Sequence, residues 1–134
     1  MTVYPANTPY LCTLRNNNYY VIMTNTITWD DFEKVEMRVG TILEVQDFPA
    51  ARKPAWQLTI DFGALGLKKS SAQITDLYAP ADLIGKQVIA VVNFPPKQIA
   101  NFFSECLVLG AVGLQKEITL LQPERAVENG LRIG

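Results

Sequence analysis

The chain has 134 residues, of which 49% are hydrophobic, and its 12 basic and 13 acidic side chains leave a net charge of −1. This length and composition fit one globular domain with a core of ordinary size. The near-neutral balance excludes binding to a polyanion through overall charge, so any contact with nucleic acid has to come from a local patch.

Several kinds of catalytic site are excluded by the residues present. The chain contains no histidine and only two cysteines, Cys12 and Cys106, which excludes Ser-His and Cys-His nucleophile pairs and leaves too few ligands for zinc. No glycine-rich phosphate loop is present. The adjacent acids Asp30 and Asp31 follow Thr28, a pattern that favours the capped first turn of a helix over a catalytic carboxylate pair. We therefore expect a binding protein and not an enzyme, with no metal and no cofactor.

The cysteines and the hydropathy pattern indicate the cellular compartment in which the protein is expected. Cys12 and Cys106 are far apart and lie in unlike contexts, which predicts free thiols in a reducing environment. No stretch approaches the roughly 20 apolar residues that span a bilayer, and the N-terminus lacks the basic and apolar regions of an export signal. We expect a cytoplasmic protein without membrane insertion.

The first 27 residues differ from the rest. They contain the turn-like run Asn16–Asn18, a single charged side chain at Arg15 and no sustained apolar period. This predicts a poorly ordered arm over residues 1–27 and a folded domain over residues 28–134. Met23 is a candidate for the natural translation start, in which case residues 1–22 are an extension assigned to the protein in error. N-terminal sequencing of the native protein tests this hypothesis.

The period-two pattern then predicts strands in series. Residues 37–45 and 56–62 alternate on either side of a proline-rich basic loop at 48–55, and the residues expected to face inward are Met37, Val39, Thr41, Leu43, Val45, Trp56, Leu58, Ile60 and Phe62. A polar strand with small side chains follows at 68–74, where we expect something to dock. Residues 75–86 predict a short helix with Thr75 as its cap, Pro80 in its first turn and Gly85 as its stop.

The second half predicts a central strand at 86–94, apolar on both faces, and further strands within 105–112, 117–123 and 130–134. Five or more strands with a short helix between the third and fourth predict an all-β OB-fold, a five-stranded Greek-key barrel with short helices. This amount of aliphatic strand exceeds what one small barrel buries. We therefore expect a homodimer with an apolar two-fold interface, formed by the C-terminal strands and the N-terminal helix.

The stretch "VVNFPPKQIANFFSECLVLGA", residues 91–111, is the main candidate for a binding loop. Pro95 and Pro96 end the central strand and stiffen a loop at the barrel mouth. Asn101 lies where the chain reverses and is the residue expected to adopt a positive φ. Phe102 and Phe103 point in opposite directions, so one caps the barrel and the other faces a ligand or subunit. Phe94 is a candidate for exposed apolar surface, but the alternation favours the core for Phe94, as it does for Trp56.

Four segments carry a resemblance to a known family: "DFEKVEMRVGTI", "SSAQIT", "GKQVIAVVNFPPKQIA" and "SECLVLGA". They closely resemble the CsaA family of bacterial secretion chaperones, which belongs to the tRNA-binding domains also appended to methionyl-tRNA synthetases. The resemblance covers about residues 28–134. It implies a homodimeric OB-fold that binds unfolded or precursor polypeptides for export, without ATP, in grooves at or near the dimer interface, with the protein export machinery as a possible partner.

The tRNA-binding members of this wider family carry a basic, glycine-containing turn followed by Ser, a variable residue, Gly and Met. Here Ser104 is retained, whereas Ala100, Asn101 and the Cys106–Leu107 pair replace the basic residue, the turn glycine and Gly-Met. The remaining candidates for contact with tRNA are Lys68, Lys69, Lys97 and Ser104, together with Arg52 and Lys53. Lysine pairs of this kind also occur as solvated faces, and so few phosphate contacts predict weak, salt-dependent binding.

A polypeptide site needs exposed apolar surface with hydrogen-bonding side chains nearby. The predicted polypeptide-binding residues are Phe102, Phe103, Tyr78, Gln73, Asn93 and Gln98. The preferred hypothesis is a dimeric chaperone of this kind, and the alternative is a module that recognises tRNA by its backbone and shape.

Overall fold

The computed structural model describes residues 10–13, 20–23 and 25–134, and the chain divides into two compact units, Met1–Lys34 and Val35–Gly134. The first unit contains the antiparallel pair β1 (Tyr10–Thr13) and β2 (Tyr20–Met23) and the helix α1 (Trp29–Glu33). The sequence pattern did not predict the strand pair. Residues 1–9, 14–19 and 24 of the expected poorly ordered arm lie outside the described residues, so that expectation and the alternative start at Met23 stay predictions.

Helix α1 begins as its sequence predicts. The Thr28 hydroxyl accepts the Asp31 N–H at 3.1 Å, and the Asp31 carboxylate accepts the Thr28 N–H at 3.0 Å. These two bonds satisfy backbone groups that the first turn leaves without helical partners. The helix-start reading of Asp30 and Asp31 is confirmed.

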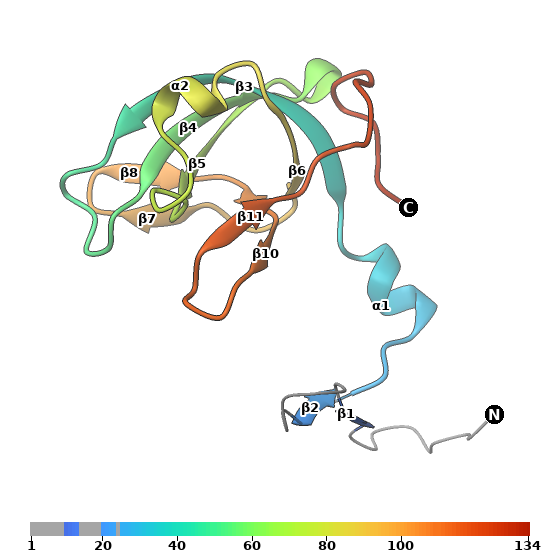
Figure 1. Ribbon diagram of the computed structural model, residues 1–134. Helices are drawn as coiled ribbons and strands as arrows, with labels where there is room; N and C mark the ends of the chain where they lie inside the picture. Colours follow the sequence, from blue (N-terminus) through green and yellow to red (C-terminus); the bar gives the residue numbers. More distant parts are fainter. Residues whose placement is uncertain (1–9, 14–19, 24) are drawn as a thin grey trace. The chain divides into compact units, whose positions relative to one another are not determined.

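The second unit is built on one antiparallel sheet that curls into a nearly closed barrel (Figure 1). Its strands, in spatial order, are β5 (Leu67–Ala72), β4 (Trp56–Asp61), β3 (Met37–Asp47), β6 (Gln87–Val91) and β9 (Leu107–Val108). A 3₁₀ turn, η1 (Gly63–Leu65), precedes β5, and helix α2 (Pro80–Leu83) connects β5 to β6. This order and the helix position confirm the predicted OB-fold.

Two hairpins extend the barrel. Strands β7 (Lys97–Ile99) and β8 (Phe102–Ser104) pair after β6, and β10 (Gly110–Val112) pairs with β11 (Ile118–Leu120) near the C-terminus. Residues 130–133 then pair with the edge of β3 that β4 leaves free: the Leu131 carbonyl accepts the Val39 N–H at 3.0 Å. In the described part of the chain, no helix is long and apolar enough to cross a membrane.

The barrel core is aliphatic and aromatic. Its fully buried side chains include Leu58, Ile60 and Phe62 of the β4 segment, as the alternation predicts, and they pack with Ile42, Leu83 and Val88. Trp56 is half-buried against this core and its indole N–H donates to the Tyr78 carbonyl at 2.9 Å.

Local backbone details correct three expectations. Leu43 is 44% exposed while Ile42 is fully buried, because a β-bulge shifts the register between Ile42 and Glu44 and reverses the faces. Helix α2 is capped by Asp82, whose carboxylate accepts the Ala79 N–H at 2.9 Å, and not by Thr75. The positive φ of the β7–β8 turn, 53°, belongs to Ala100 and not to Asn101.

Candidate functional site

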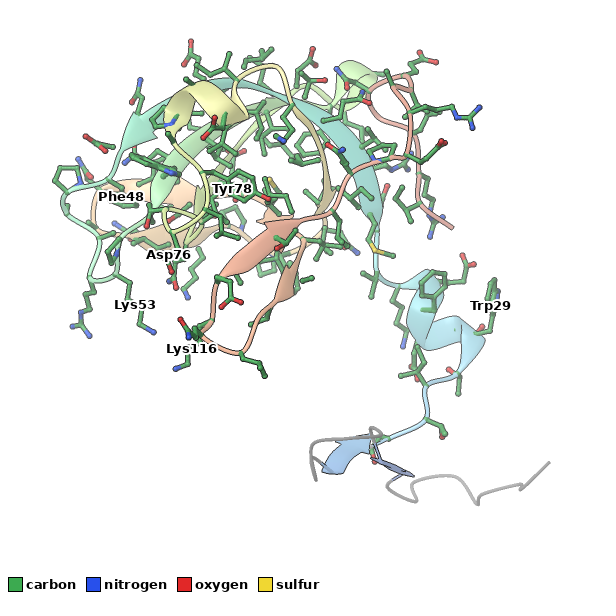
Figure 2. The ribbon with its side chains drawn as sticks, in the orientation of Figure 1. Trp29, Phe48, Lys53, Asp76, Tyr78 and Lys116 are labelled. Atoms are coloured by element: carbon green, nitrogen blue, oxygen red, sulfur yellow. The ribbon has the colours of Figure 1, made fainter. Side chains whose placement is uncertain are left out.

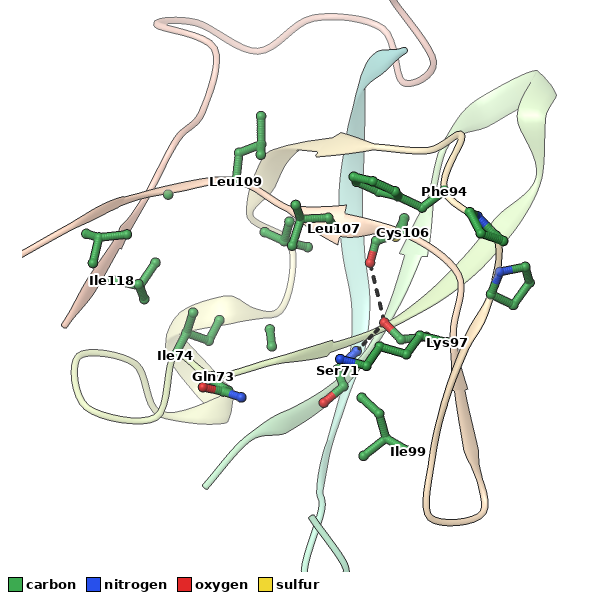
Figure 3. A pocket seen from close by; sticks show the side chains of 17 residues that line it. Ser71, Gln73, Ile74, Phe94, Lys97, Ile99, Cys106, Leu107, Leu109 and Ile118 are labelled. Atoms are coloured by element: carbon green, nitrogen blue, oxygen red, sulfur yellow. Dashed lines mark hydrogen bonds between the residues drawn. The ribbon is translucent and has the colours of Figure 1, made fainter. Parts of the chain in front are cut away.

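A groove of about 820 Å³ opens beside the end of β5 (Figure 3). It is bounded by the end of β5, the loop after β6, the β7–β8 hairpin and strands β9 to β11. Its walls are mainly apolar: Ile74, Phe94, Pro95, Pro96, Ile99, Leu107, Leu109, Val112 and Ile118. Of the described residues that line it, Lys97 alone carries a charge. A concave apolar surface with few polar groups is suited to binding apolar side chains.

The prolines create one wall of this groove. Strand β6 ends at Val91, and Pro95 and Pro96, which cannot donate to a strand ladder, lead the chain out of the barrel into β7. In the β7–β8 hairpin Lys97 pairs with Ser104, and both residues line the groove. The intervening pair, Gln98 and Phe103, points to the opposite face because side chains alternate along a strand.

Serine side chains close the barrel beside the groove. The Glu105 N–H donates to the Lys69 carbonyl at 2.7 Å, and the Ser70 hydroxyl donates to the Cys106 carbonyl at 2.9 Å. The Ser104 hydroxyl accepts the Ser71 N–H at 3.1 Å and donates to the Cys106 carbonyl at 3.4 Å (Figure 3). Segment 104–106 of the same chain therefore packs against the small side chains of β5.

Cys106 is a buried free thiol at this closure. Burial raises its pKa from 9.0 to about 11, although the hydrogen bond with Ser70 and the charge of Lys68 oppose the shift. A thiol with so high a pKa carries almost no thiolate at neutral pH and is a poor nucleophile. Among the described residues, no cluster of three or more His, Cys, Asp or Glu side chains has the arrangement of a metal site.

The predicted polypeptide-binding residues do not form one surface. Gln73 lines the groove. Tyr78 is half-buried, and its hydroxyl accepts the Leu120 N–H at 3.0 Å while Lys86 lies 5.6 Å from the centre of its ring. The Asn93 side chain accepts the Glu36 N–H at 3.0 Å. Tyr78 and Asn93 thus stabilise the barrel through these bonds.

The two phenylalanines of β8 separate as the alternation predicts. Phe102 is 8% exposed and its ring centre lies 5.3 Å from that of Phe48, whereas Phe103 is 54% exposed. Gln98 is exposed beside Phe103, and its side-chain amide donates to the Ala100 carbonyl at 3.1 Å. Phe102 supports the hairpin, and Phe103 with Gln98 presents the face that points away from the groove.

The assignment of Phe94 to the core was wrong. Its side chain is 54% exposed and lines the groove. The alternation of β6 stops at Val91, so it does not extend to Phe94, and the following prolines were the signal that the strand had ended. The groove contributions of Leu107, Leu109 and Ile118 were also missed, because an apolar strand pattern does not tell a core face from a groove face.

The residues predicted to contact tRNA are dispersed. Lys68 shares the inward face of β5 with Ser70, whereas Lys69 points outward and its backbone N–H donates to the Glu105 carboxylate at 3.3 Å. Lys97 lies in the groove, and the Ser104 hydroxyl is engaged in the barrel closure. The basic loop at 48–55 is elsewhere: Figure 2 shows Lys53 at its outer end, and Phe48 connects the loop to β8 through the contact with Phe102.

Solved structures similar to this chain include two chaperones. The chaperone CsaA of Bacillus anthracis is 50% identical with a TM-score of 0.78, covering 81% of this chain and 99% of that one. The CsaA chaperone protein of Picrophilus torridus is 55% identical with a TM-score of 0.77, covering 81% and 100%. A protein of Pyrococcus horikoshii described as related to methionyl-tRNA synthetase is 26% identical with a TM-score of 0.74, covering 83% and 100%.

Curated relatives include much longer proteins. The methionine–tRNA ligase of Cupriavidus necator is 34% identical over 116 residues, which are 84% of this chain and only 17% of the ligase. The family model "Putative tRNA binding domain" matches residues 37–132, nearly all of the barrel unit. This family is defined by a binding domain and not by a catalytic one. The chain belongs to the tRNA-binding domain family and resembles its CsaA chaperone members in sequence and in fold.

Proposed function

We propose that the chain is an ATP-independent chaperone that binds unfolded or precursor polypeptides in the cytoplasm for export. The observation that carries the proposal is the groove of about 820 Å³, with apolar walls and one charged side chain. An unfolded client offers apolar side chains and unpaired backbone groups, and it has to be bound with little regard to sequence. The high identity to two proteins named as CsaA chaperones supports the same reading.

We include a homodimer in the proposal. Large apolar side chains are exposed on the N-terminal unit, with Trp29 at 70%, and on the barrel unit, with Leu114 at 93% and Val112 at 70%. Association of two copies would remove such side chains from water. Sedimentation equilibrium at low micromolar concentration tests this, and a monomeric mass would contradict it.

A second candidate function, binding of tRNA, is favoured by the family match over residues 37–132. The contact between Phe48 and Phe102 holds the loop with Arg52 and Lys53 against the hairpin that exposes Phe103. Basic side chains suit phosphates, and an exposed aromatic ring suits unstacked bases. At a net charge of −1, such contacts give weak binding that falls steeply with salt.

The two functions are separated by titrating the protein with an unfolded precursor polypeptide and with bulk tRNA, each at 50 and 200 mM salt. The chaperone proposal expects polypeptide binding that changes little with salt and tRNA binding that is absent or lost at the higher salt. Strong tRNA binding with a steep negative salt slope, without polypeptide binding, would overturn it.

A further inference from the structure

The unpaired part of the β5 edge offers a specific way to bind an extended chain. The backbone groups of Lys69 and Ser71 have partners outside β4, so by the alternation of an antiparallel ladder those of residues 68, 70 and 72 point toward β4. On the other edge, the Lys69 carbonyl accepts the Glu105 N–H at 2.7 Å and the Ser71 N–H donates to the Ser104 hydroxyl at 3.1 Å. Ser104 is the last residue that joins this edge to the rest of the barrel.

Beyond that point the edge faces the groove. In the described part of the chain, β5 is an end strand of the five-stranded sheet, and Ser71 and Gln73 both line the groove. The same alternation directs the backbone of Gln73 outward. Strands β9 and β10 form the opposite wall, with Leu107 and Leu109 across from Ser71 and Gln73 (Figure 3). The outer edge of β5 at Ser71–Gln73 therefore faces the groove.

Resting on the proposed function, we propose that the client binds as an extended strand that pairs with the β5 edge at Ser71–Gln73 and carries a carboxylate near Lys97. Main-chain pairing of this kind gives affinity without sequence preference, and apolar walls receive alternate side chains. The carboxylate follows from charge complementarity, because Lys97 is the one charged side chain among the described lining residues. The occupant is thus an apolar, acid-containing extended segment.

The test uses a fluorescently labelled nine-residue peptide of alternating valine and threonine with one aspartate, and the intact protein. Single N-methyl groups are placed on successive peptide residues, which removes one backbone donor at a time and leaves the protein unchanged. Strand pairing predicts a period of two: methylation at alternate positions lowers affinity about tenfold, and methylation at the positions between changes it less than about twofold. A uniform effect at all positions would overturn the pairing.

The charge requirement has its own matched variants. Lys97→Glu should weaken binding of the aspartate peptide several-fold and have no such effect on its asparagine analogue, whereas Arg125→Glu, at an exposed side chain outside the groove, should leave both unchanged. Equal effects on the two peptides would overturn the role of Lys97.

The outcomes also separate this inference from the proposed function. If unfolded precursor binds but the methylation pattern lacks the period of two, the chaperone proposal stands and strand pairing is wrong. If neither precursor nor peptide binds, both fail. If the peptide is displaced as the protein self-associates at high concentration, a second copy occupies the edge and the inference is overturned.

Discussion

The ring of Phe102 lies 5.3 Å from the ring of Phe48, centre to centre, and both side chains are buried. The contact holds the β7–β8 hairpin against the 48–55 loop, so it fixes one wall of the groove. Phe102→Ala should therefore lower the free energy of unfolding by about 3 kcal/mol, since it removes a buried aromatic ring.

The neighbouring residue supplies the control for this prediction. Phe103 is 54% exposed and lies on the opposite face, so the same substitution can be made there as a control. Phe103→Ala should lower the free energy of unfolding by less than about 0.5 kcal/mol. Urea unfolding of both variants measures the difference. Equal losses would show that the two rings are not divided between core and surface.

A tight contact at Gly40 leads to a second prediction. A Cβ added there would lie 2.6 Å from Ile60 Cγ2 and 2.7 Å from Phe62 Cε1, both fully buried and unable to yield easily. Gly40→Ala should destabilise the barrel by about 2 kcal/mol through overpacking. Gly66→Ala is a useful comparison, because its Cβ would meet no atom within 4 Å and its cost arises only from the φ of 83°. A stabilising Gly40→Ala would contradict this packing.

Much of the fold was predictable because local patterns and tertiary packing agree. The alternation of Leu58, Ile60 and Phe62 and the capping pair of Thr28 and Asp31 both report local geometry, and both were confirmed. The bulge after Ile42 was not predictable. The extra residue in β3 is determined by the pairing with β4, and nothing in the order of apolar residues along the sequence marks it.

The site was less predictable than the fold. Phe94 and Leu107 look like core residues in sequence, and only the path of the chain after Pro95 and Pro96 leaves them facing a groove. Tyr78 and Asn93 look like free binding groups, but their partners, Leu120 and Glu36, are distant in sequence. Hydrogen bonds between such distant residues depend on the assembled barrel.

Burial of Cys106 predicts a dependence of stability on pH. Its pKa is about 11 in the folded protein against 9.0 for an exposed thiol, so the unfolded chain releases this proton first. The stability linked to this group is complete below pH 9 and is lost as the pH rises toward 11, by about 2 kcal/mol at pH 10.5.

Urea unfolding at pH 8 and 10.5 measures this loss, with Cys106→Ala as the comparison because other groups titrate in both proteins. The variant should lose about 2 kcal/mol less than the parent between the two pH values. An identical loss in both proteins would show that the thiol does not contribute.

Because the basic residues are dispersed, substituting them in pairs should show which pair contributes more to tRNA affinity. Arg52→Ala with Lys53→Ala should lower tRNA affinity at 50 mM salt more than Lys68→Ala with Lys69→Ala. The first pair is exposed on one loop, whereas Lys68 faces inward and Lys69 lies beside Glu105. Each lost phosphate contact should also reduce the salt slope by about one unit. A larger effect of the β5 pair would place the phosphate contacts on that strand.

The final prediction concerns client binding and uses two rings of equal exposure. Phe94 and Phe103 are each 54% exposed, but Phe94 lines the groove and Phe103 points away from it. Phe94→Ala should weaken binding of an unfolded precursor about tenfold, because a large apolar side chain of the groove wall is removed. Fluorescence anisotropy of a labelled precursor measures the affinity.

Phe103→Ala should leave that affinity within about twofold of the parent, and urea unfolding should show that both variants retain the parent's stability. Both variants remove a phenylalanine ring of the same exposed fraction, so the two sites differ in the face of the barrel on which they lie. If Phe103→Ala were the damaging change, the client would bind on the outer face of the β7–β8 hairpin, where the predicted polypeptide-binding residues Phe103 and Gln98 lie, and the groove would not be the polypeptide site.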